Sequence, residues 1–286
     1  MIKTENILKL IPDNLKKIIP EDLRSFESVS GIRLKAGSPA YLTGPEEKTL
    51  SDTTVCFEDI ERIITSATEN SLYAYIDGIR NGYITVKGGH RLGICGRAVY
   101  EDGKLKNVKN ISYINIRISR QVKGAAIPVM KYISSEVING ILIISPPGGG
   151  KTTLLRDLAR ILGNTPGTRP AVIDSRCEIG AEFEGVAYND TGERTFLLSG
   201  YSRSDGFSHA IRALSPDIIL CDEIGGEEDA RFIFEAAFCG VRVIATAHGT
   251  DVEGIKKRKG FAGLIGDVFG CAVILDNREI KQIIKL

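Results

Sequence analysis

The sequence lacks a charge excess of either sign. Its 286 residues contain 37 lysines and arginines against 36 aspartates and glutamates, so the formal net charge is +1. A chain this close to neutrality has no general attraction for nucleic acid or anionic lipid, and either partner would need a local patch. We therefore expect no direct contact with nucleic acid. The one dense basic run, Lys256 to Lys259, is typical of a solvated helix end, and contact with a membrane surface or nucleic acid is the alternative.

Paired cysteines, a signal peptide and a long hydrophobic run are also missing. The six cysteines form no Cys-x-x-Cys pair, and several, such as Cys221 and Cys271, lie in apolar stretches like the reduced core residues of a cytosolic protein. The first twenty residues carry six charged side chains, unlike a signal peptide. The longest apolar stretch, Phe232 to Ala247, contains Glu235 and Arg242 and is too short to span a bilayer. We expect a cytoplasmic protein that is not integral to a membrane.

The composition is that of an ordinary folded protein, with 43% hydrophobic residues and a length sufficient for two domains. The sequence has no internal repeats or low-complexity tracts. Residues 1–25 predict two short helices punctuated by Pro12 and Pro20, with an apolar stripe that could serve for docking. Residues 26–124 predict a small α+β domain in which short strands surround one helix over 57–75. Its expected strands are 31–35, 40–43, 82–87, 91–100 and 114–118, with a hairpin turn over 101–104.

Residues 125–286 alternate helix and strand, which is the pattern of parallel βαβ units. The predicted strands are nearly continuous apolar runs, as a parallel sheet buried on both faces requires. They are expected at 140–144, 171–174, 217–222, 241–246 and 271–275. The fold class of this half is therefore α/β, with a mainly parallel sheet and a nucleotide-binding core.

A glycine-rich loop follows the first of these strands and leads into a helix predicted over 152–162. Its three consecutive glycines allow backbone N–H groups to point into one concavity, and the helix dipole adds positive charge there, so a phosphate fits. In the G-x-x-x-x-G-K-[ST] pattern, Lys151 reaches the β- and γ-phosphates and the Thr152 hydroxyl ligates Mg²⁺. Ser145 replaces the first glycine of that pattern, and a plain strand-to-helix turn with a surface lysine is the alternative. The predicted ATP-binding residues are Ser145, Pro146, Pro147, Gly148, Gly149, Gly150, Lys151, Thr152 and Thr153.

Carboxylates end two other predicted strands. Asp222 is expected to hold Mg²⁺ directly or through water, and Glu223 to polarise the attacking water; a solvated turn is the alternative. Asp174 and Glu178 fall at the same edge of the sheet, where open α/β folds bind ligands, and are candidates to tune the metal and the water. Arg176 could instead pair with Glu178 on the surface.

One histidine is well placed for catalysis. A strand ends at His248 and a glycine turn, so its imidazole is expected at the same edge, where it can donate a hydrogen bond to the γ-phosphate. A structural role is the alternative. His90 is expected in a turn and His209 on a helix surface, and neither has metal-ligand spacing with partners.

Four elements thus stand in order and resemble the Walker A, Asp box, Walker B and His box of the type II/type IV secretion ATPase superfamily. They are Ser-Pro-Pro-Gly-Gly-Gly-Lys-Thr-Thr from Ser145, Val-Ile-Asp-Ser-Arg-Cys-Glu from Val172, Ser-Pro-Asp-Ile-Ile-Leu-Cys-Asp-Glu-Ile-Gly-Gly from Ser215, and Ala-Thr-Ala-His-Gly from Ala245. Closer still is the likeness to the stage III sporulation branch of that superfamily, which Gly-Gly-His-Arg-Leu-Gly-Ile-Cys-Gly-Arg from Gly88 also carries. The resemblance covers nearly everything after residue 25.

This resemblance implies a RecA-like P-loop core, preceded by the small α+β domain, in an ATPase that forms a homohexamer. It implies a cytoplasmic motor, peripheral to the membrane on the mother-cell side, that acts with integral membrane proteins of the channel into the forespore and powers assembly or transport there. The residues that match the catalytic motifs are Lys151, Thr152, Asp174, Glu178, Glu223 and His248.

One departure from the superfamily concerns an arginine. Many members have Gly-Glu-Ile-Arg at Walker B, where this chain has Asp-Glu-Ile-Gly from Asp222. In ring ATPases an arginine from a neighbouring domain or subunit neutralises charge on the transferred phosphoryl group. Candidates for this role are Arg91, Arg97, Arg117, Arg120, Arg203 and Arg212, and a surface salt bridge is the alternative for each.

The core motifs leave two other functions open. A RecA-like nucleic-acid translocase would share them, although no stripe of aromatic and basic residues is evident. A nucleotide-gated scaffold that organises membrane partners without hydrolysis is the second. A GTPase is disfavoured because the sequence has no Asn-Lys-x-Asp motif to read guanine.

Overall fold

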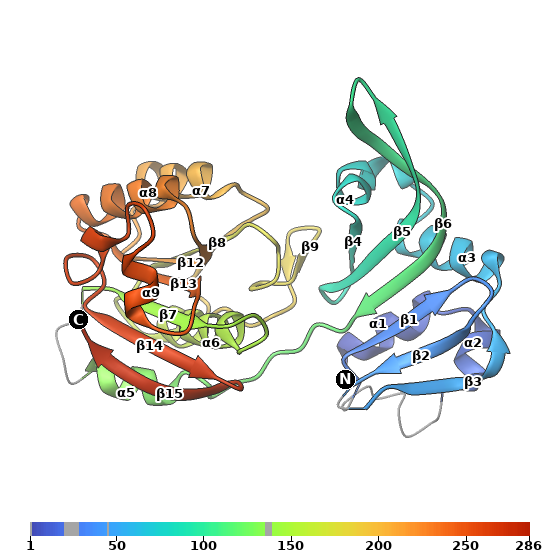
Figure 1. Cartoon of the computed structure of the whole chain (residues 1–286), viewed down its shortest axis with the longest axis horizontal. Coiled ribbons are helices and arrows are strands. Elements are labelled where there is room, and N and C mark those ends of the chain that lie inside the picture. The colour runs from blue at the N-terminus through green and yellow to red at the C-terminus, as the bar shows by residue number, and fades with distance from the viewer. Residues whose placement is uncertain (1, 20–28, 45, 135–138) are drawn as a thin grey trace. The chain divides into compact units, whose positions relative to one another are not determined.

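The computed structural model describes residues 2–19, 29–44, 46–134 and 139–286, which form two compact units (Figure 1). Unit 1 comprises Met1–Arg120 and Ala181–Tyr188, whereas unit 2 comprises Gln121–Gly180 and Asn189–Leu286. The boundary after Arg120 lies close to the joint expected near Gly124. Each unit has its own hydrophobic core, as the two core clusters of unit 2 and the single cluster of unit 1 show.

Unit 1 is built on an antiparallel sheet of six strands in the order β3-β2-β1-β6-β5-β4 (Figure 1). The strands are β1 (Gly31–Lys35), β2 (Pro39–Thr43), β3 (Lys48–Thr54), β4 (Tyr83–Val86), β5 (His90–Glu101) and β6 (Lys104–Arg117). The predicted turn between β5 and β6 is confirmed, since Asp102 and Gly103 have φ of 51° and 73°, as a type I′ hairpin turn requires. β3 was not predicted because its sequence is mostly polar. A short hairpin of β9 (Glu182–Phe183) and β10 (Val186–Ala187) completes the unit.

The amino-terminal helices α1 (Ile2–Leu10) and α2 (Asp13–Ile18) belong to the core of unit 1. Of the predicted apolar stripe, Ile11, Leu15 and Ile19 are buried in the same cluster as the strands of the sheet, and Leu10 and Ile18 are partly buried against it. These side chains are therefore not available as a docking surface. The remainder of the predicted 1–25 segment, residues 1 and 20–25, lies outside the described residues.

The single helix predicted over 57–75 is interrupted. α3 spans Phe57–Ala67 and buries Ile60, Ile63 and Ile64 at helical spacing. The chain then turns at Glu69 and Asn70, whose φ values of 47° and 64° lie in the left-handed region. A 3₁₀ turn, η2 (Leu72–Tyr75), and α4 (Ile76–Arg80) follow. An asparagine tolerates this left-handed conformation better than most residues, which explains where α3 stops.

Unit 2 contains a seven-stranded sheet in the order β11-β8-β12-β13-β7-β14-β15 (Figure 1). Its strands are β7 (Ile141–Ser145), β8 (Pro170–Asp174), β11 (Phe196–Ser199), β12 (Ile218–Ile224), β13 (Arg242–His248), β14 (Cys271–Asp276) and β15 (Glu279–Lys285). All neighbours are parallel except β14 and β15. The five predicted strands are confirmed. The two edge strands β11 and β15 were not predicted: β11 has only four residues, and polar and charged residues interrupt the apolar ones of β15.

Helices cover both faces of this sheet. The helices of unit 2 are α5 (Ile127–Ser134), α6 (Lys151–Asn164), α7 (Arg203–His209), the π-helical turn η3 (Ala210–Leu214), α8 (Glu227–Phe238), α9 (Val252–Lys256) and the 3₁₀ turn η4 (Ala262–Leu264). Alternate residues of β7 show the division, because Ile141 and Ile143 pack with α6 whereas Leu142 and Ile144 pack with α7 and α8. No helix in the described part of the chain combines the length and apolar character needed to cross a bilayer.

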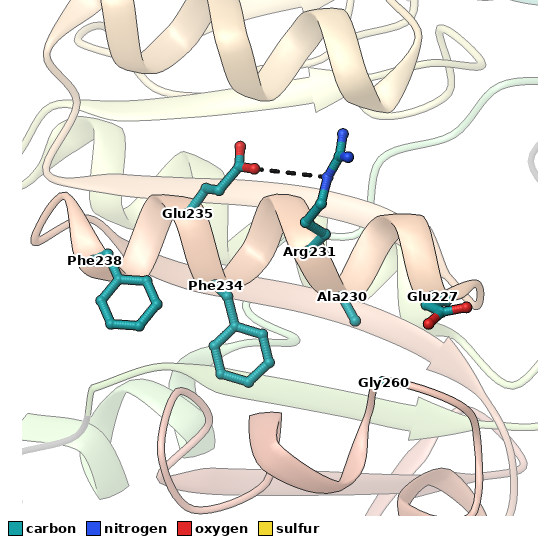
Figure 2. A pocket seen from close by; sticks show the side chains of 7 residues that line it. All are labelled: Glu227, Ala230, Arg231, Phe234, Glu235, Phe238 and Gly260. Carbon is teal, nitrogen blue, oxygen red and sulfur yellow. Dashed lines mark ion pairs between the residues drawn. The ribbon is translucent and has the colours of Figure 1, made fainter.

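A shallow apolar hollow of about 450 Å³ runs along the outer side of α8 (Figure 2). Phe234 and Phe238 line it, with their ring centroids 6.4 Å apart, and the loop at Gly260 closes one side. Phe238 is 88% exposed. The hollow has no lining residue in common with the predicted nucleotide site.

Candidate active site

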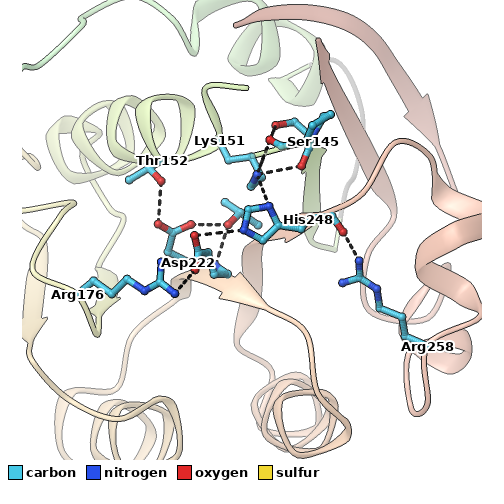
Figure 3. A network of polar contacts seen from close by, with 10 residues as sticks. Ser145, Lys151, Thr152, Arg176, Asp222, His248 and Arg258 are labelled. Atoms are coloured by element: carbon cyan, nitrogen blue, oxygen red, sulfur yellow. Dashed lines mark hydrogen bonds and ion pairs between the residues drawn. The ribbon is translucent and has the colours of Figure 1, made fainter. Parts of the chain in front are cut away.

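Four parallel strands of unit 2 bring the predicted motifs to one edge of the sheet. β8, β12, β13 and β7 are consecutive neighbours, so their carboxyl ends meet there. Ser145 ends β7, Asp174 ends β8 and His248 ends β13, while Asp222 and Glu223 lie near the end of β12. A connected network of polar contacts joins several of these side chains (Figure 3).

The glycine loop between β7 and α6 has the backbone of a phosphate cradle. Gly148 and Gly150 have φ of 74° and 97°, a region that residues with a Cβ rarely adopt. A Cβ on Gly149 would collide with the hydroxyl oxygen of Ser145. α6 begins at Lys151, directly after the loop, so its free N–H groups face the same point. These observations fit a bound phosphate group.

Lys151 is buried inside this loop. Its ammonium donates to the carbonyl oxygens of Ser145 at 2.9 Å and Pro146 at 3.0 Å, and it lies 3.1 Å from Nδ1 of His248 (Figure 3). Burial lowers the pKa of Lys151, and the charges of Asp222 and Glu223 oppose this shift. The structure thus brings together two predicted catalytic residues from different motifs.

Thr152 and Asp222, the two residues predicted to bind Mg²⁺, are in direct contact. The Thr152 hydroxyl donates to Oδ2 of Asp222 at 2.9 Å. The other carboxylate oxygen of Asp222 accepts from the hydroxyl of Thr246, and that hydroxyl oxygen accepts the N–H of Glu223 at 2.8 Å. Hydroxyl and carboxylate oxygens are the ligands that Mg²⁺ prefers, so this pair fits the ion. Thr246 was not singled out in the sequence, although a threonine in an apolar strand is a signal of a buried polar contact.

Glu223 has an unusual backbone, and its carboxylate lies beside an arginine and a histidine. The register of β12 against β13 shifts between Cys221 and Ile224, and Glu223 has a φ of 55°. Its carboxylate lies 2.6 Å from the guanidinium of Arg176 and 3.4 Å from Nε2 of His248 (Figure 3). Arg176 therefore pairs with Glu223, whereas the alternative considered from the sequence was a surface pair with Glu178.

Asp174 organises the loop that follows β8. Its side chain is almost fully buried, and its carboxylate accepts the backbone N–H groups of Glu178, Ile179 and Gly180 at 2.8–3.0 Å. Burial raises the pKa of Asp174, against the opposing effect of these three donors. Arg156 of α6 binds the same loop by donating to the carbonyl oxygens of Glu178 and Ile179. Arg156 was missed because its place in an amphipathic helix resembles that of any surface arginine.

The arginines singled out in the sequence lie in varied surroundings. Arg203 pairs with Asp229 at 2.6 Å, and Arg91 stacks 3.9 Å from the ring centroid of Tyr83 in unit 1. Arg212 is exposed on η3. The others lie in unit 1 and are Arg97, Arg117 and Arg120. Arg176, which contacts the predicted base, was not among the six.

The other two histidines lie outside the polar network, and of the basic run Arg258 reaches it through a backbone contact (Figure 3). His90 is fully buried at the start of β5, where its Nδ1 accepts the N–H of Ser119, so its role in unit 1 is structural. His209 is exposed on α7, as predicted, beside the ring of Tyr201. In the basic run, Lys256 pairs with an acidic residue of its own helix, Lys259 pairs with one of α8, and Arg258 donates to the carbonyl oxygen of His248.

Proteins of known sequence resemble this chain over most of its length. The family model described as sporulation stage III, protein AA, matches residues 1–285. The stage III sporulation protein AA of Bacillus subtilis (strain 168) is 32% identical over 257 residues, which cover 88% of this chain and 84% of that protein.

Solved structures show the same fold at low sequence identity. The ATPase DotB of Legionella pneumophila has a TM-score of 0.63 and 17% identity, covering 92% of this chain and 76% of its own. The pilus retraction motor PilT, solved with bound ADP, has a TM-score of 0.61 and 16% identity with the same coverage. These likenesses confirm the predicted α/β fold with a RecA-like core. The sequence match, which spans nearly every residue, shows that the chain belongs to the sporulation stage III, protein AA family.

Proposed function

We propose that this chain is a Mg²⁺-dependent ATPase that hydrolyses ATP to ADP and phosphate. The observation that carries the proposal is the convergence of Lys151, the Thr152–Asp222 pair and Glu223 at the carboxyl edge of one parallel sheet. A glycine loop, a hydroxyl beside a carboxylate and a second carboxylate are what phosphoryl transfer to water needs. The fold, which the ATPase DotB shares, supports the same reaction.

The residues take distinct roles in this proposal. The N–H groups of the loop bind the phosphates, and Lys151 leaves the carbonyl oxygens of the loop to contact them. Thr152 and Asp222 hold Mg²⁺, which supplies charge neutralisation when bound. Glu223 accepts the proton of the attacking water, and His248 lies between that carboxylate and Lys151.

The Asp box takes a supporting role. Asp174 acts through the loop that it holds, because three backbone N–H groups occupy its carboxylate. For Glu178 we retain the role expected from its motif, that of tuning the metal and the water.

At the level of the assembly, we propose a homohexameric motor that is cytoplasmic and peripheral to the membrane on the mother-cell side. It would act with integral membrane proteins of the channel into the forespore and power assembly or transport. Membership of a sporulation family and the secretion-ATPase fold support this wider role.

Hydrolysis and assembly are tested on the purified full-length chain. Release of phosphate from ATP is measured with Mg²⁺ for the wild type and for Glu223→Gln, which keeps the size of the side chain and removes the base. We expect the variant to bind ATP and to lose at least about 100-fold in kcat, because the water is no longer polarised. Light scattering with and without ATP and Mg²⁺ then reports the particle mass. A wild type no faster than Glu223→Gln at every concentration would exclude the hydrolytic motor.

The nucleotide-gated scaffold is the second candidate, and one observation favours it. Glu223 is engaged by Arg176 and His248, and a carboxylate paired with a guanidinium is a weaker base towards water. Complementation separates the two functions. If Glu223→Gln restores sporulation to a strain that lacks the wild-type copy, hydrolysis is dispensable and the scaffold is correct.

A further inference from the structure

Arg176 is the cation in closest contact with the proposed catalytic base. Its guanidinium lies 2.6 Å from Oε2 of Glu223 (Figure 3). The same carboxylate lies 3.4 Å from His248, and His248 lies 3.1 Å from the ammonium of Lys151. One carboxylate and one imidazole therefore separate Arg176 from the lysine that is proposed to contact the β- and γ-phosphates.

The loop that carries Arg176 is held from two sides. The carboxylate of Asp174 accepts hydrogen bonds from the N–H groups of residues 178–180, and the guanidinium of Arg156 donates to the carbonyl oxygens of Glu178 and Ile179. The turn between them is tight, because Cys177 has a φ of 53° and its N–H donates to the carbonyl oxygen of Asp174 at 3.1 Å. Since Arg156 belongs to α6, the helix that begins at the phosphate loop also anchors the loop of Arg176. The backbone at Arg176 is thus fixed, while its side chain reaches inward to Glu223.

The bond between Arg176 and Glu223 is of a kind that can be exchanged. The Arg176 side chain is 58% exposed, and ion pairs with so exposed a cation are weak. A terminal phosphate carries more charge than a carboxylate and accepts the two parallel bonds of a guanidinium equally well. A triphosphate in the loop would therefore compete for Arg176.

We propose that Arg176 contacts the γ-phosphate of ATP bound to the same subunit, and that it pairs with Glu223 only when no γ-phosphate is present. This rests on the proposed ATPase function and adds a catalytic arginine in cis. Transfer of the guanidinium to the γ-phosphate leaves the Glu223 carboxylate free to accept a proton from water. The same movement of Arg176 brings the positive charge of its guanidinium to the phosphoryl group while that group is transferred to water.

The test compares nucleotides with and without the γ-phosphate on the full-length chain. Affinities for ADP and for a non-hydrolysable ATP analogue are measured by competition with a fluorescent nucleotide, alongside kcat, for the wild type, Arg176→Ala and Arg176→Lys. Arg231→Ala is the control, since Arg231 is an exposed arginine of α8 that pairs with Glu235 on the same helix. For Arg176→Ala we expect about a 10-fold loss of affinity for the analogue, an ADP affinity within about 2-fold of wild type, and a kcat lower by about 100-fold. Arg176→Lys should recover part of the affinity for the analogue, and the control should match the wild type.

Three results for Arg176→Ala would overturn the inference and leave the proposed ATPase function standing. Equal losses of ADP and analogue affinity in Arg176→Ala would assign Arg176 a structural role in its loop. A rise in kcat would make it only a restraint on Glu223, and unchanged affinities with unchanged kcat would remove it from the site. A wild type that binds neither nucleotide would instead overturn the proposed ATPase function, and this inference with it.

Discussion

Glu223 is the residue at which backbone strain and proposed chemistry coincide. Its φ of 55° is disfavoured for a residue with a Cβ, and the shift in strand register places it at a bulge. Strain of this kind persists only where surrounding contacts impose it, here the N–H bond to Thr246 and the ion pair with Arg176. Because of the bulge, the Glu223 side chain does not follow the alternation of side chains between the two faces of the strand, and its carboxylate lies beside His248.

This strain predicts that glycine at position 223 is tolerated better than alanine. Both substitutions remove the carboxylate, but only glycine relieves the left-handed backbone, so Glu223→Gly should be about 1 kcal/mol more stable than Glu223→Ala. Urea unfolding of the two variants measures the difference in free energy of unfolding, and neither should hydrolyse ATP. An alanine variant as stable as the glycine variant would contradict a strained residue.

At the scale of elements, α8 shows how a helix start can be coupled to a neighbouring helix. Asp229 accepts the N–H groups of Gly225 at 2.8 Å and Gly226 at 3.1 Å, just before the helix, and pairs with Arg203 of α7. Burial tends to raise the pKa of Asp229, yet these hydrogen bonds and the guanidinium hold it below its ordinary value of 3.8. The Asp229 carboxylate thus links residues 225 and 226, which follow Glu223 in the chain, to Arg203 at the start of α7.

Asp229→Ala should therefore destabilise unit 2 by about 1–2 kcal/mol, because two N–H groups and a guanidinium lose their acceptor. The folded-state pKa is depressed, so the unfolded chain binds the proton more readily and the stabilisation falls as pH falls. The advantage of the wild type should be full above about pH 5 and should disappear below the folded-state pKa, on the acid side of 3.8. Urea unfolding of both proteins at pH 7 and at low pH checks this, and a pH-independent difference would contradict it.

Elements were predictable where their signal is local. The buried strands of unit 2 appear in the sequence as continuous apolar runs, and the phosphate loop appears as three consecutive glycines. In the structure two of these glycines have φ of 74° and 97°. β3 and β15 are polar strands without such a run, so pairing with a neighbour and not composition makes them strands. The break after α3 depends on Glu69 and Asn70, which the helical pattern over 57–75 concealed.

At the scale of the whole molecule, the order of strands in unit 2 determines what can meet. β13 lies between β7 and β12, so its terminal His248 falls between the phosphate loop and Glu223. β8 lies on the far side of β12 and delivers the loop of Arg176 from there. A nucleotide that contacts the ends of several of these strands should therefore stabilise the folded state of unit 2.

Ligand binding should therefore raise the stability of unit 2. At a concentration 100 times its Kd, a non-hydrolysable ATP analogue with Mg²⁺ should add about 2.7 kcal/mol to the free energy of unfolding. Differential scanning calorimetry would record this as an upward shift of a transition. Lys151→Ala should lose the shift because the phosphates lose their cation, whereas Glu223→Gln should keep it. An equal shift in Lys151→Ala would place nucleotide binding elsewhere.

Local sequence was enough to predict the phosphate loop, the parallel core and the carboxylates near the end of β12, because glycine conformation and apolar runs act over a few residues. The tertiary structure alone decided the partners. Lys151 meets His248 across 97 residues, Glu223 pairs with Arg176, and the carboxylate of Asp174 is occupied by its own loop. Such contacts depend on strand order and on side-chain direction at a shared edge. No local pattern encodes them, because residues far apart in the chain become neighbours only once the sheet has formed.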